Sequence, residues 1–235
     1  MTTSGSRDDF KALVFDLDGT LYESRQLRRA MFWRIVRAHA ATPWEGLQVL
    51  RAVQCYRQSQ ERLRDNSFVN DDLAAAQLQL ACQLSGVSEQ VLAAWVARWM
   101  ELEPLAILPA CLRHGTVELL RKAKRLGYGL AVCSDYPATK KLKAMGIESF
   151  FDVVVTARDA NVQQLKPHPK SLQEALHRLG VKNSEGLYVG DRPDVDAEAA
   201  SRAGIKCVIL DPDQSFAAIS GLLTPRTCRV AQAVI

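Results

Sequence analysis

Short runs of apolar residues alternate with amphipathic stretches along the C-terminal half of the chain. Runs at 129–134, 151–156, 186–191 and 205–210 have the length of buried strands, and a similar run at 12–16 precedes them. Between these runs, apolar residues recur every three or four positions, a spacing that indicates helices. Because strands and helices alternate, the pattern predicts an α/β fold with a parallel sheet and helices on both of its faces.

The segment that follows the first strand has a different pattern. Its apolar residues recur at helical spacing in separate stripes, of which Leu27, Met31 and Ile35 form the first. Asp71 is placed to cap a later helix of this segment, and Pro104 is placed to end the last one. The tryptophans of the chain are expected in the core of this helical segment: Trp33, Trp44, Trp95 and Trp99.

These two patterns predict two structural units. Residues 8–21 and 110–220 are expected to form a discontinuous α/β core with a Rossmann-like parallel sheet. An all-helical domain at 22–109 is expected as an insertion between the first strand of that core and the rest. Residues 221–235 form a C-terminal tail to which the sequence assigns no function.

Composition and charge exclude several classes of protein. A chain of 235 residues with 48% apolar and 24% charged residues has the composition of a globular protein. The formal net charge of +4 is spread along the chain without a basic run, so no nucleic-acid partner is expected. The six cysteines lack metal-binding spacing, and no run reaches the ~20 apolar residues of a membrane span. We therefore expect a cytoplasmic protein without a membrane partner, and leave its oligomeric state open.

Polar side chains that suit phosphoryl chemistry stand at the ends of the predicted strands. Asp16 and Asp18 follow the first apolar run, Ser134 ends the second, and Asp191 ends the fourth. Lys166 lies in a loop before a predicted helix. Ligands of parallel α/β sheets bind beyond the carboxyl ends of the strands, so these side chains are expected to meet in one crevice. Clustered carboxylates favour Mg²⁺, and a carboxylate nucleophile beside Mg²⁺ and a lysine suits phosphoryl transfer.

The same residues carry a resemblance to the haloacid dehalogenase-like (HAD) hydrolase superfamily. The first motif of that family, Asp-x-Asp-Gly-Thr after an apolar strand, is matched by Asp16-Leu17-Asp18-Gly19-Thr20. The later motifs are matched by Ser134, by Lys166-Pro167, and by Gly190-Asp191 followed by Asp196. All motifs occur in order, each in the predicted strand or loop context. The resemblance implies a HAD-like fold in which the helical insertion is a cap of the C1 type.

The resemblance also implies a role for each matched residue. Asp16 would be the nucleophile that forms an aspartyl-phosphate, and Asp18 would protonate the leaving oxygen and later activate water. The phosphate group would be bound by Ser134, Lys166, Gly19 and Thr20. A Mg²⁺ ion would be held by Asp16, the backbone carbonyl of Asp18, Asp191 and Asp196, the last acting through water.

Two positions depart from the family pattern. Many relatives have asparagine after the serine of the second motif, whereas this chain has Asp135. This extra carboxylate would repel a phosphate unless it points away or is neutralised. The fourth motif contains both Asp194 and Asp196, and we favour Asp196 as the residue that orients metal-bound water. Tyr22, Glu23 and Asp135 are predicted to contact the substrate.

Two features narrow the reaction that the resemblance leaves open. Dehalogenase relatives usually lack an aspartate at the position of Asp18, so its presence favours phosphoester chemistry. Phosphonate hydrolases and sugar-phosphate mutases of the family use a cap lysine, and this chain has no lysine between Lys11 and Lys122. We therefore predict a Mg²⁺-dependent phosphatase, similar to phosphoglycolate phosphatases, that acts on a small phosphorylated metabolite. The alternatives are a phosphotransferase or mutase with an acceptor other than water, and a non-catalytic phosphometabolite sensor.

Overall fold

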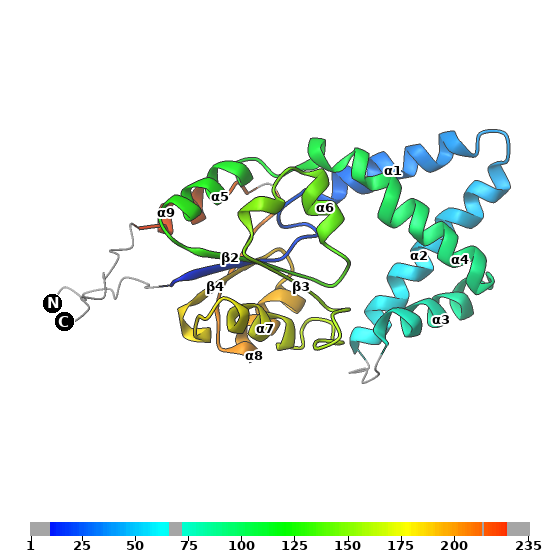
Figure 1. Ribbon diagram of the computed structural model, residues 1–235. Coiled ribbons are helices and arrows are strands. Elements are labelled where there is room, and N and C mark those ends of the chain that lie inside the picture. Colours follow the sequence, from blue (N-terminus) through cyan, green and yellow to red (C-terminus); the bar gives the residue numbers. More distant parts are fainter. Residues whose placement is uncertain (1–9, 66–71, 213, 225–235) are drawn as a thin grey trace, which may run out of the picture.

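The computed structural model describes residues 10–65, 72–212 and 214–224, and the structural statements below concern these residues. Their strands form one parallel sheet in the order β3-β2-β1-β4-β5 (Figure 1). The strands are β1 (Ala12–Phe15), β2 (Gly129–Ser134), β3 (Val153–Thr156), β4 (Gly186–Gly190) and β5 (Lys206–Ile209). The predicted α/β fold is therefore confirmed, although most of the strands end slightly inside the apolar runs.

Alternate residues of the central strand β1 point to opposite faces of the sheet. Leu13 and Phe15 pack into the hydrophobic core on one face, and Ala12 and Val14 pack into the core on the other. Because helices cover both faces, every residue of β1 is buried. Helices α5 and α9 lie on one face and α7 and α8 on the other (Figure 1). Their bounds are α5 Thr116–Arg125, α7 Lys170–Arg178, α8 Glu198–Ala203 and α9 Ala217–Leu222.

The described residues between β1 and α5 form helices and no strand. The main helices are α1 Ser24–Ala38, α2 Pro43–Asp65, α3 Leu73–Ser85 and α4 Glu89–Val96, which continues into the π-helical η1 Ala97–Leu102. The short 3-10 helices η2 Glu103–Ala106 and η3 Leu108–Cys111 lead back to the core. The described residues of the insertion are therefore helical, as expected, and they lie beside the carboxyl edge of the sheet (Figure 1). The division into a cap domain at 22–109 stays a prediction, and the insertion is called the cap below.

The helix ends of the cap refine the sequence prediction. Asp71 lies outside the described residues, and its neighbour Asp72 caps α3 by accepting a hydrogen bond from the Ala75 amide at 2.9 Å. The run of α4 and η1 ends at Leu102, shortly before Pro104, which lies in the first turn of η2. Within the described part of the chain, no helix is both long and apolar enough to span a membrane.

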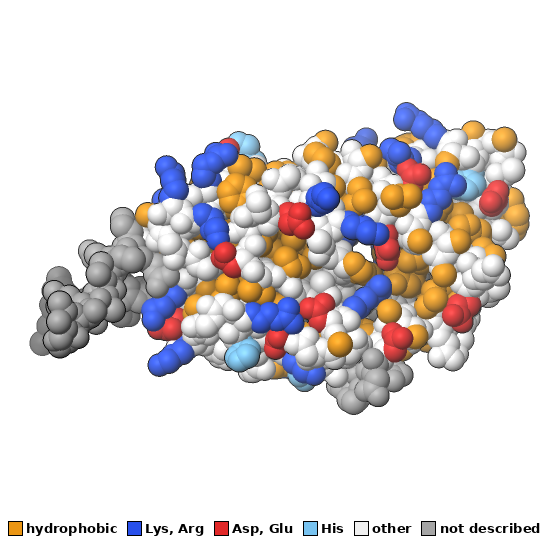
Figure 2. Space-filling model, in the orientation of Figure 1, with side chains coloured by type: hydrophobic (Ala, Val, Ile, Leu, Met, Phe, Trp, Pro, Cys, Tyr) orange, Lys and Arg blue, Asp and Glu red, His pale blue; other side chains and the backbone are white. Residues whose placement is uncertain are grey.

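Two tryptophans lie on the surface, contrary to the prediction that all of them are in the cap core. Trp99 is 3% exposed and Trp95 packs against the core, but Trp33 and Trp44 are 52% and 73% exposed. Trp33 is two positions after the buried Met31 on α1, so it points about 200° around the helix from the buried stripe. Figure 2 shows hydrophobic side chains at the surface of the cap.

The two segments that connect the cap to the sheet run side by side. Tyr22 of the first segment and Leu112 of the second form an isolated antiparallel bridge. The buried guanidinium of Arg113 donates hydrogen bonds to the backbone carbonyls of Gly19 and Thr20 at 2.5 and 2.8 Å. Arg113 therefore ties the second connection to the turn that follows β1.

Candidate active site

The carboxyl ends of the strands bring the predicted motif residues to one cleft. Asp16 and Asp18 follow β1, Asp191 follows β4, and Lys166 comes from the loop between β3 and α7; all of them line the cleft. Ser134, the last residue of β2, lies directly beside this group, with its hydroxyl 3.4 Å from Asp18. The cleft has a volume of about 1020 Å³ and is walled by both the sheet edge and the cap.

Lys166 is the centre of a buried polar network. Its ammonium Nζ lies 2.6 Å from Asp16 Oδ1 and 2.7 Å from Asp196 Oδ1, and it donates to the Tyr188 hydroxyl at 3.0 Å. The Tyr188 hydroxyl in turn donates to Asp196 Oδ1 at 2.8 Å. Burial lowers the pKa of Lys166, but the charge of Asp16 and its other partners outweigh this effect and raise that pKa. Lys166 is therefore a fixed positive charge beside Asp16.

The ionisation of Asp16 depends on a balance between burial and charge. Burial raises the pKa of the Asp16 carboxyl to about 7, Lys166 opposes the rise, and the charges of Asp196 and Asp191 add to it. For Asp196 the balance is reversed, because hydrogen bonds and the charge of Lys166 outweigh burial and lower its pKa. A further cation beside these carboxylates would favour the ionised Asp16 that a nucleophile requires.

Three carboxylates lie close enough together to hold one cation. Ligand oxygens of Asp16, Asp191 and Asp196 all lie within 4.8 Å of one another. The turn after β1 comes against this group, because Gly19 has φ +112° and a Cβ built on it would lie 2.2 Å from Asp191 Oδ2. A set of oxygen ligands fits Mg²⁺. The Asp18 carboxylate is not part of the group, and metal binding by the Asp18 carbonyl stays a prediction.

Of the two acids in the fourth motif, Asp196 faces the site. It is 1% exposed, and its Oδ2 accepts hydrogen bonds from the backbone amides of Asp191 and Arg192 at 3.2 and 3.0 Å. The Asp194 side chain is 68% exposed and pairs with Arg192 at 2.7 Å. Thr20 is fully buried and donates a hydrogen bond of 3.4 Å to Asp191 Oδ1, which supports the turn. The structure thus brings Asp196, rather than Asp194, to the other predicted metal ligands.

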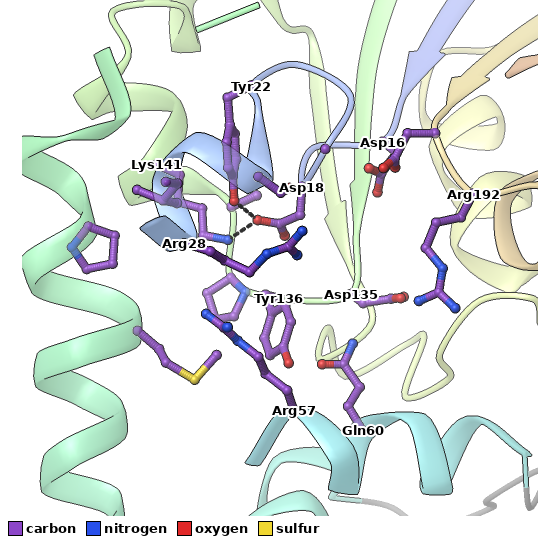
Figure 3. Close-up of a pocket in the computed structure, with 18 of the residues that line it drawn as sticks. Asp16, Asp18, Tyr22, Arg28, Arg57, Gln60, Asp135, Tyr136, Lys141 and Arg192 are labelled. Atoms are coloured by element: carbon purple, nitrogen blue, oxygen red, sulfur yellow. Dashed lines mark hydrogen bonds and ion pairs between the residues drawn. The ribbon is translucent and has the colours of Figure 1, made fainter. Parts of the chain in front are cut away.

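Asp18 points toward the cap side of the cleft. Its Oδ1 accepts hydrogen bonds from the Tyr22 hydroxyl and from Lys141 Nζ on helix α6 (Thr139–Ala144), the second at 2.5 Å (Figure 3). Burial raises the pKa of Asp18, but Lys141 and Tyr22 outweigh it, so the pKa is lowered overall. In this arrangement Asp18 is held as a carboxylate. Tyr22 lines the cleft, and its contact with a substrate stays a prediction.

Asp135 is neutralised by a residue of the cap. Arg64 on α2 donates to Asp135 Oδ2 at 2.9 Å and to the backbone carbonyl of Lys166, while Asp135 Oδ1 accepts the Lys166 amide at 3.2 Å. The two side chains are only 7% and 12% exposed. Nearby, Glu61 on α2 pairs with Arg192 at 2.9 Å. These contacts explain how an acid is tolerated after Ser134, and they join the cap to the core.

Sequence reasoning missed several residues of the site. In the sequence, Lys141 is only one polar residue of a predicted amphipathic helix, and Tyr188 is one residue of a predicted buried strand. Arg64 is one of many arginines in the predicted cap. The unmatched charge of Asp135 was the one available signal, because a buried acid requires a cation. Glu23 is exposed and lines the cleft, and no hydrogen bond or ion pair of its side chain occurs within the described residues.

Comparisons with known proteins identify the family of this chain. The model of the haloacid dehalogenase-like hydrolase family matches residues 10–204. The chain is 32% identical over 205 residues to a glyceraldehyde 3-phosphate phosphatase of Methanopyrus kandleri, covering 84% of this chain and 82% of that one. It is 30% identical over 203 residues to a validoxylamine A 7'-phosphate phosphatase of Streptomyces hygroscopicus subsp. limoneus, covering 85% and 84%.

Solved structures share the fold. The HAD-hydrolase YfnB from Bacillus subtilis, solved bound to magnesium, superimposes with a TM-score of 0.64 at 14% identity and covers 88% of this chain and 91% of that one. Sequence identity at this level supports the fold alone. The family match and the two phosphatase relatives show that this chain belongs to the haloacid dehalogenase-like hydrolases and is a phosphatase-type enzyme.

Proposed function

We propose that this enzyme is a Mg²⁺-dependent hydrolase of small-molecule phosphomonoesters that works through an aspartyl-phosphate on Asp16. The observation that carries the proposal is the place of Asp16, whose Oδ1 lies 2.6 Å from Lys166 Nζ in the group formed with Asp191 and Asp196. A carboxylate among fixed positive charges can attack an anionic phosphate that an isolated carboxylate would repel. Two relatives that are named for phosphorylated small molecules support the substrate class.

In the first step, an Asp16 oxygen attacks the phosphorus atom, and the bond between phosphorus and the leaving oxygen breaks. Lys166 balances the negative charge on the phosphoryl oxygens, and the Ser134 hydroxyl donates a hydrogen bond to one of them. A Mg²⁺ ion held by Asp16, Asp191 and Asp196 would neutralise further charge on the phosphoryl group. The product of this step is the aspartyl-phosphate and a free leaving group.

Asp18 moves the protons in both steps. It gives a proton to the leaving oxygen, and then takes a proton from the water whose oxygen attacks the phosphorus. The bond between Asp16 and phosphorus breaks, and inorganic phosphate leaves. Because Lys141 and Tyr22 hold Asp18 as a carboxylate, substrate entry must weaken these contacts before Asp18 can carry the proton.

The cap favours small substrates. The cleft is bounded on one side by residues of α1 and α2, and the contacts of Glu61 and Arg64 hold this wall against the core. A closed wall excludes water from the aspartyl-phosphate until the leaving group has left. The proposed substrate is therefore a small phosphorylated metabolite. The proposed location of the enzyme is the cytoplasm.

The proposal is tested by measuring phosphate release from a panel of small phosphomonoesters, with Mg²⁺ and with EDTA. The wild-type enzyme is compared with Asp16→Asn and with Asp194→Asn, a control that changes an exposed carboxylate of the same region. Release should require Mg²⁺, fall by at least about 1000-fold in Asp16→Asn, and persist in Asp194→Asn.

Two other results would redirect the proposal. Turnover of an ester only when an acceptor alcohol is added, without free phosphate, would favour a phosphotransferase. A folded protein that binds esters and Mg²⁺ but converts none of them would overturn the enzymatic role and favour a sensor.

A further inference from the structure

Helix α2 of the cap has an exposed stripe in addition to the side that it buries. Its buried side includes Val49, which is fully buried in the core. Trp44, Leu47, Gln48 and Arg51 recur at spacings of three and four positions on another side, and all four are exposed. Trp44 and Leu47 are 73% and 55% exposed. The described part of the chain therefore leaves an apolar face of α2 without a packing partner.

The exposed stripe forms one wall of a groove on the cap. The other wall comes from the turn at 85–88, between α3 and α4, and from Val91 and Trp95 of α4. The groove has a volume of about 550 Å³, and no described residue lines both this groove and the catalytic cleft. Exposed apolar surface with a polar rim is typical of an interaction site, so this groove is a candidate for one.

Charges of opposite sign lie along this groove. Glu45 and Arg51 both line it, and they are six positions apart on α2, or about 9 Å along the helix. Arg51 forms no hydrogen bond or ion pair with any described residue, and the Glu45 carboxylate accepts a hydrogen bond from the Thr42 hydroxyl at 3.0 Å. A lipid surface attracts clustered basic residues, which this mixed rim does not provide. The rim instead suits a protein surface that presents the same two charges in the opposite order.

A second copy of the chain presents that surface. Gln48 lies midway between Glu45 and Arg51 in the sequence, so a two-fold axis at Gln48 aligns two α2 helices in antiparallel directions. Glu45 of each copy then lies opposite Arg51 of the other, which gives two ion pairs. The same symmetry brings the exposed Trp44 and Leu47 of each copy against the apolar groove of the other. The surface is therefore complementary to itself in both shape and charge.

We infer that the protein forms a two-fold symmetric dimer through this groove, with the two α2 helices packed antiparallel about Gln48. A large aromatic side chain buries roughly 150–250 Å². A patch led by one tryptophan therefore gives an interface at the lower end of the size range, below the ~800 Å² per partner of a standard interface. The dimer is expected to dissociate on dilution. The inference does not rest on the proposed phosphatase function, because the groove and the cleft are separate.

Sedimentation equilibrium at protein concentrations between about 1 and 200 µM measures the dissociation constant of the dimer. Leu47→Ser removes apolar surface from the stripe, and its control Leu102→Ser removes a leucine that is 65% exposed and does not line the groove. Glu45→Arg and Arg51→Glu each reverse one charge, and the double variant exchanges the two charges. The substituted side chains are all exposed, and circular dichroism verifies that each variant is folded.

The wild type should reach twice the mass of one chain as its concentration rises. Leu47→Ser should raise the dissociation constant at least about 10-fold, whereas Leu102→Ser should leave it unchanged. Each single charge reversal should weaken the dimer by a similar factor, and the double variant should restore it, because the exchanged charges again face opposite charges across the two-fold axis.

Three results would overturn the inference. A wild type that stays monomeric at every concentration would leave the groove to a different partner. A dimer that Leu47→Ser and both charge reversals leave intact would use another surface. A double variant that dissociates as readily as the single reversals would exclude the antiparallel pairing of Glu45 with Arg51.

Discussion

The ion pair between Arg64 and Asp135 fastens the cap to the core, and its removal tests how strongly that contact stabilises the protein. The pair joins α2 to the loop after β2 with an N–O distance of 2.9 Å, and its side chains are 7% and 12% exposed. We choose Arg64→Met, which keeps the apolar stem, and Asp135→Asn, which keeps an oxygen able to accept the Lys166 amide. The double variant completes a thermodynamic cycle.

The magnitude follows from burial and distance. Two unit charges about 4 Å apart attract by about 4 kcal/mol at an effective dielectric constant of about 20, and desolvation removes part of that. Removing one partner leaves the other buried without a partner, so each single variant should lose about 2–4 kcal/mol in free energy of unfolding. The double variant should lose less than the sum of the two, with a coupling energy of about 2 kcal/mol.

Equilibrium unfolding in urea measures the four free energies, since they follow from the midpoint and slope of each transition. Additive effects within about 0.5 kcal/mol would refute the reasoning, because the pair would then contribute no specific interaction. Losses below about 1 kcal/mol in both single variants would also refute it, by showing that the cap swings away and lets water reach both charges.

Three further outcomes are expected. Gly19→Ala should weaken Mg²⁺ binding in a calorimetric titration, because its Cβ would clash with Asp191; Gly86→Ala, also at positive φ but with open space around it, should keep binding normally. Lys141→Met should raise the pKa that Asp18 shows in the pH profile of kcat, because the ammonium that lowers this pKa is removed, whereas Lys143→Met should not. Lys124 and the Leu130 amide lower the pKa of Asp152 despite its partial burial. The stabilisation that this carboxylate contributes is present above its unfolded-state pKa and is lost as the pH falls through its folded-state pKa. The free energy of unfolding of Asp152→Asn, measured in urea, should therefore decrease less steeply than that of the wild type as the pH is lowered.

Each of these outcomes has a clear opposite. Equal Mg²⁺ affinity in Gly19→Ala would mean that Asp191 can move without loss. An unchanged pH profile of kcat in Lys141→Met would show that Lys141 does not control the protonation of Asp18. If the free energy of unfolding decreases as steeply at low pH in Asp152→Asn as in the wild type, other carboxylates cause this loss of stability.

The core of the site could be predicted from the sequence because strand order and strand ends determine it. Asp16, Ser134 and Asp191 each come directly at or after a buried strand, and parallel strands deliver their carboxyl ends to the same edge. Local chain direction therefore suffices to bring these residues together. The alternation of strand and helix fixed the fold class for the same reason.

The remaining contacts could not be predicted because they depend on how two units pack. Arg64 reaches Asp135 only when α2 lies against the loop after β2, and no local pattern encodes that approach. The exposed Trp33 and Trp44 show the same limit, since hydrophobicity indicates burial on average but not which face of a helix finds a neighbour. Lys141 was missed because it lies 123 positions from Asp18 in the sequence, so the contact arises only in the folded chain.

The insertion of the cap also has a consequence for folding. The central strand β1 pairs with β2 and β4, where Ala12 is aligned with Gly129 and Gly186, so its partners are synthesised much later than it is. Closing such a long loop costs conformational entropy, and contacts of high sequence separation slow folding. A cap that forms its own helices first would shorten the effective loop and bring its two connections together at Arg113. The order of events would then be cap first and sheet second, with the catalytic turn completed only as the central strand is captured.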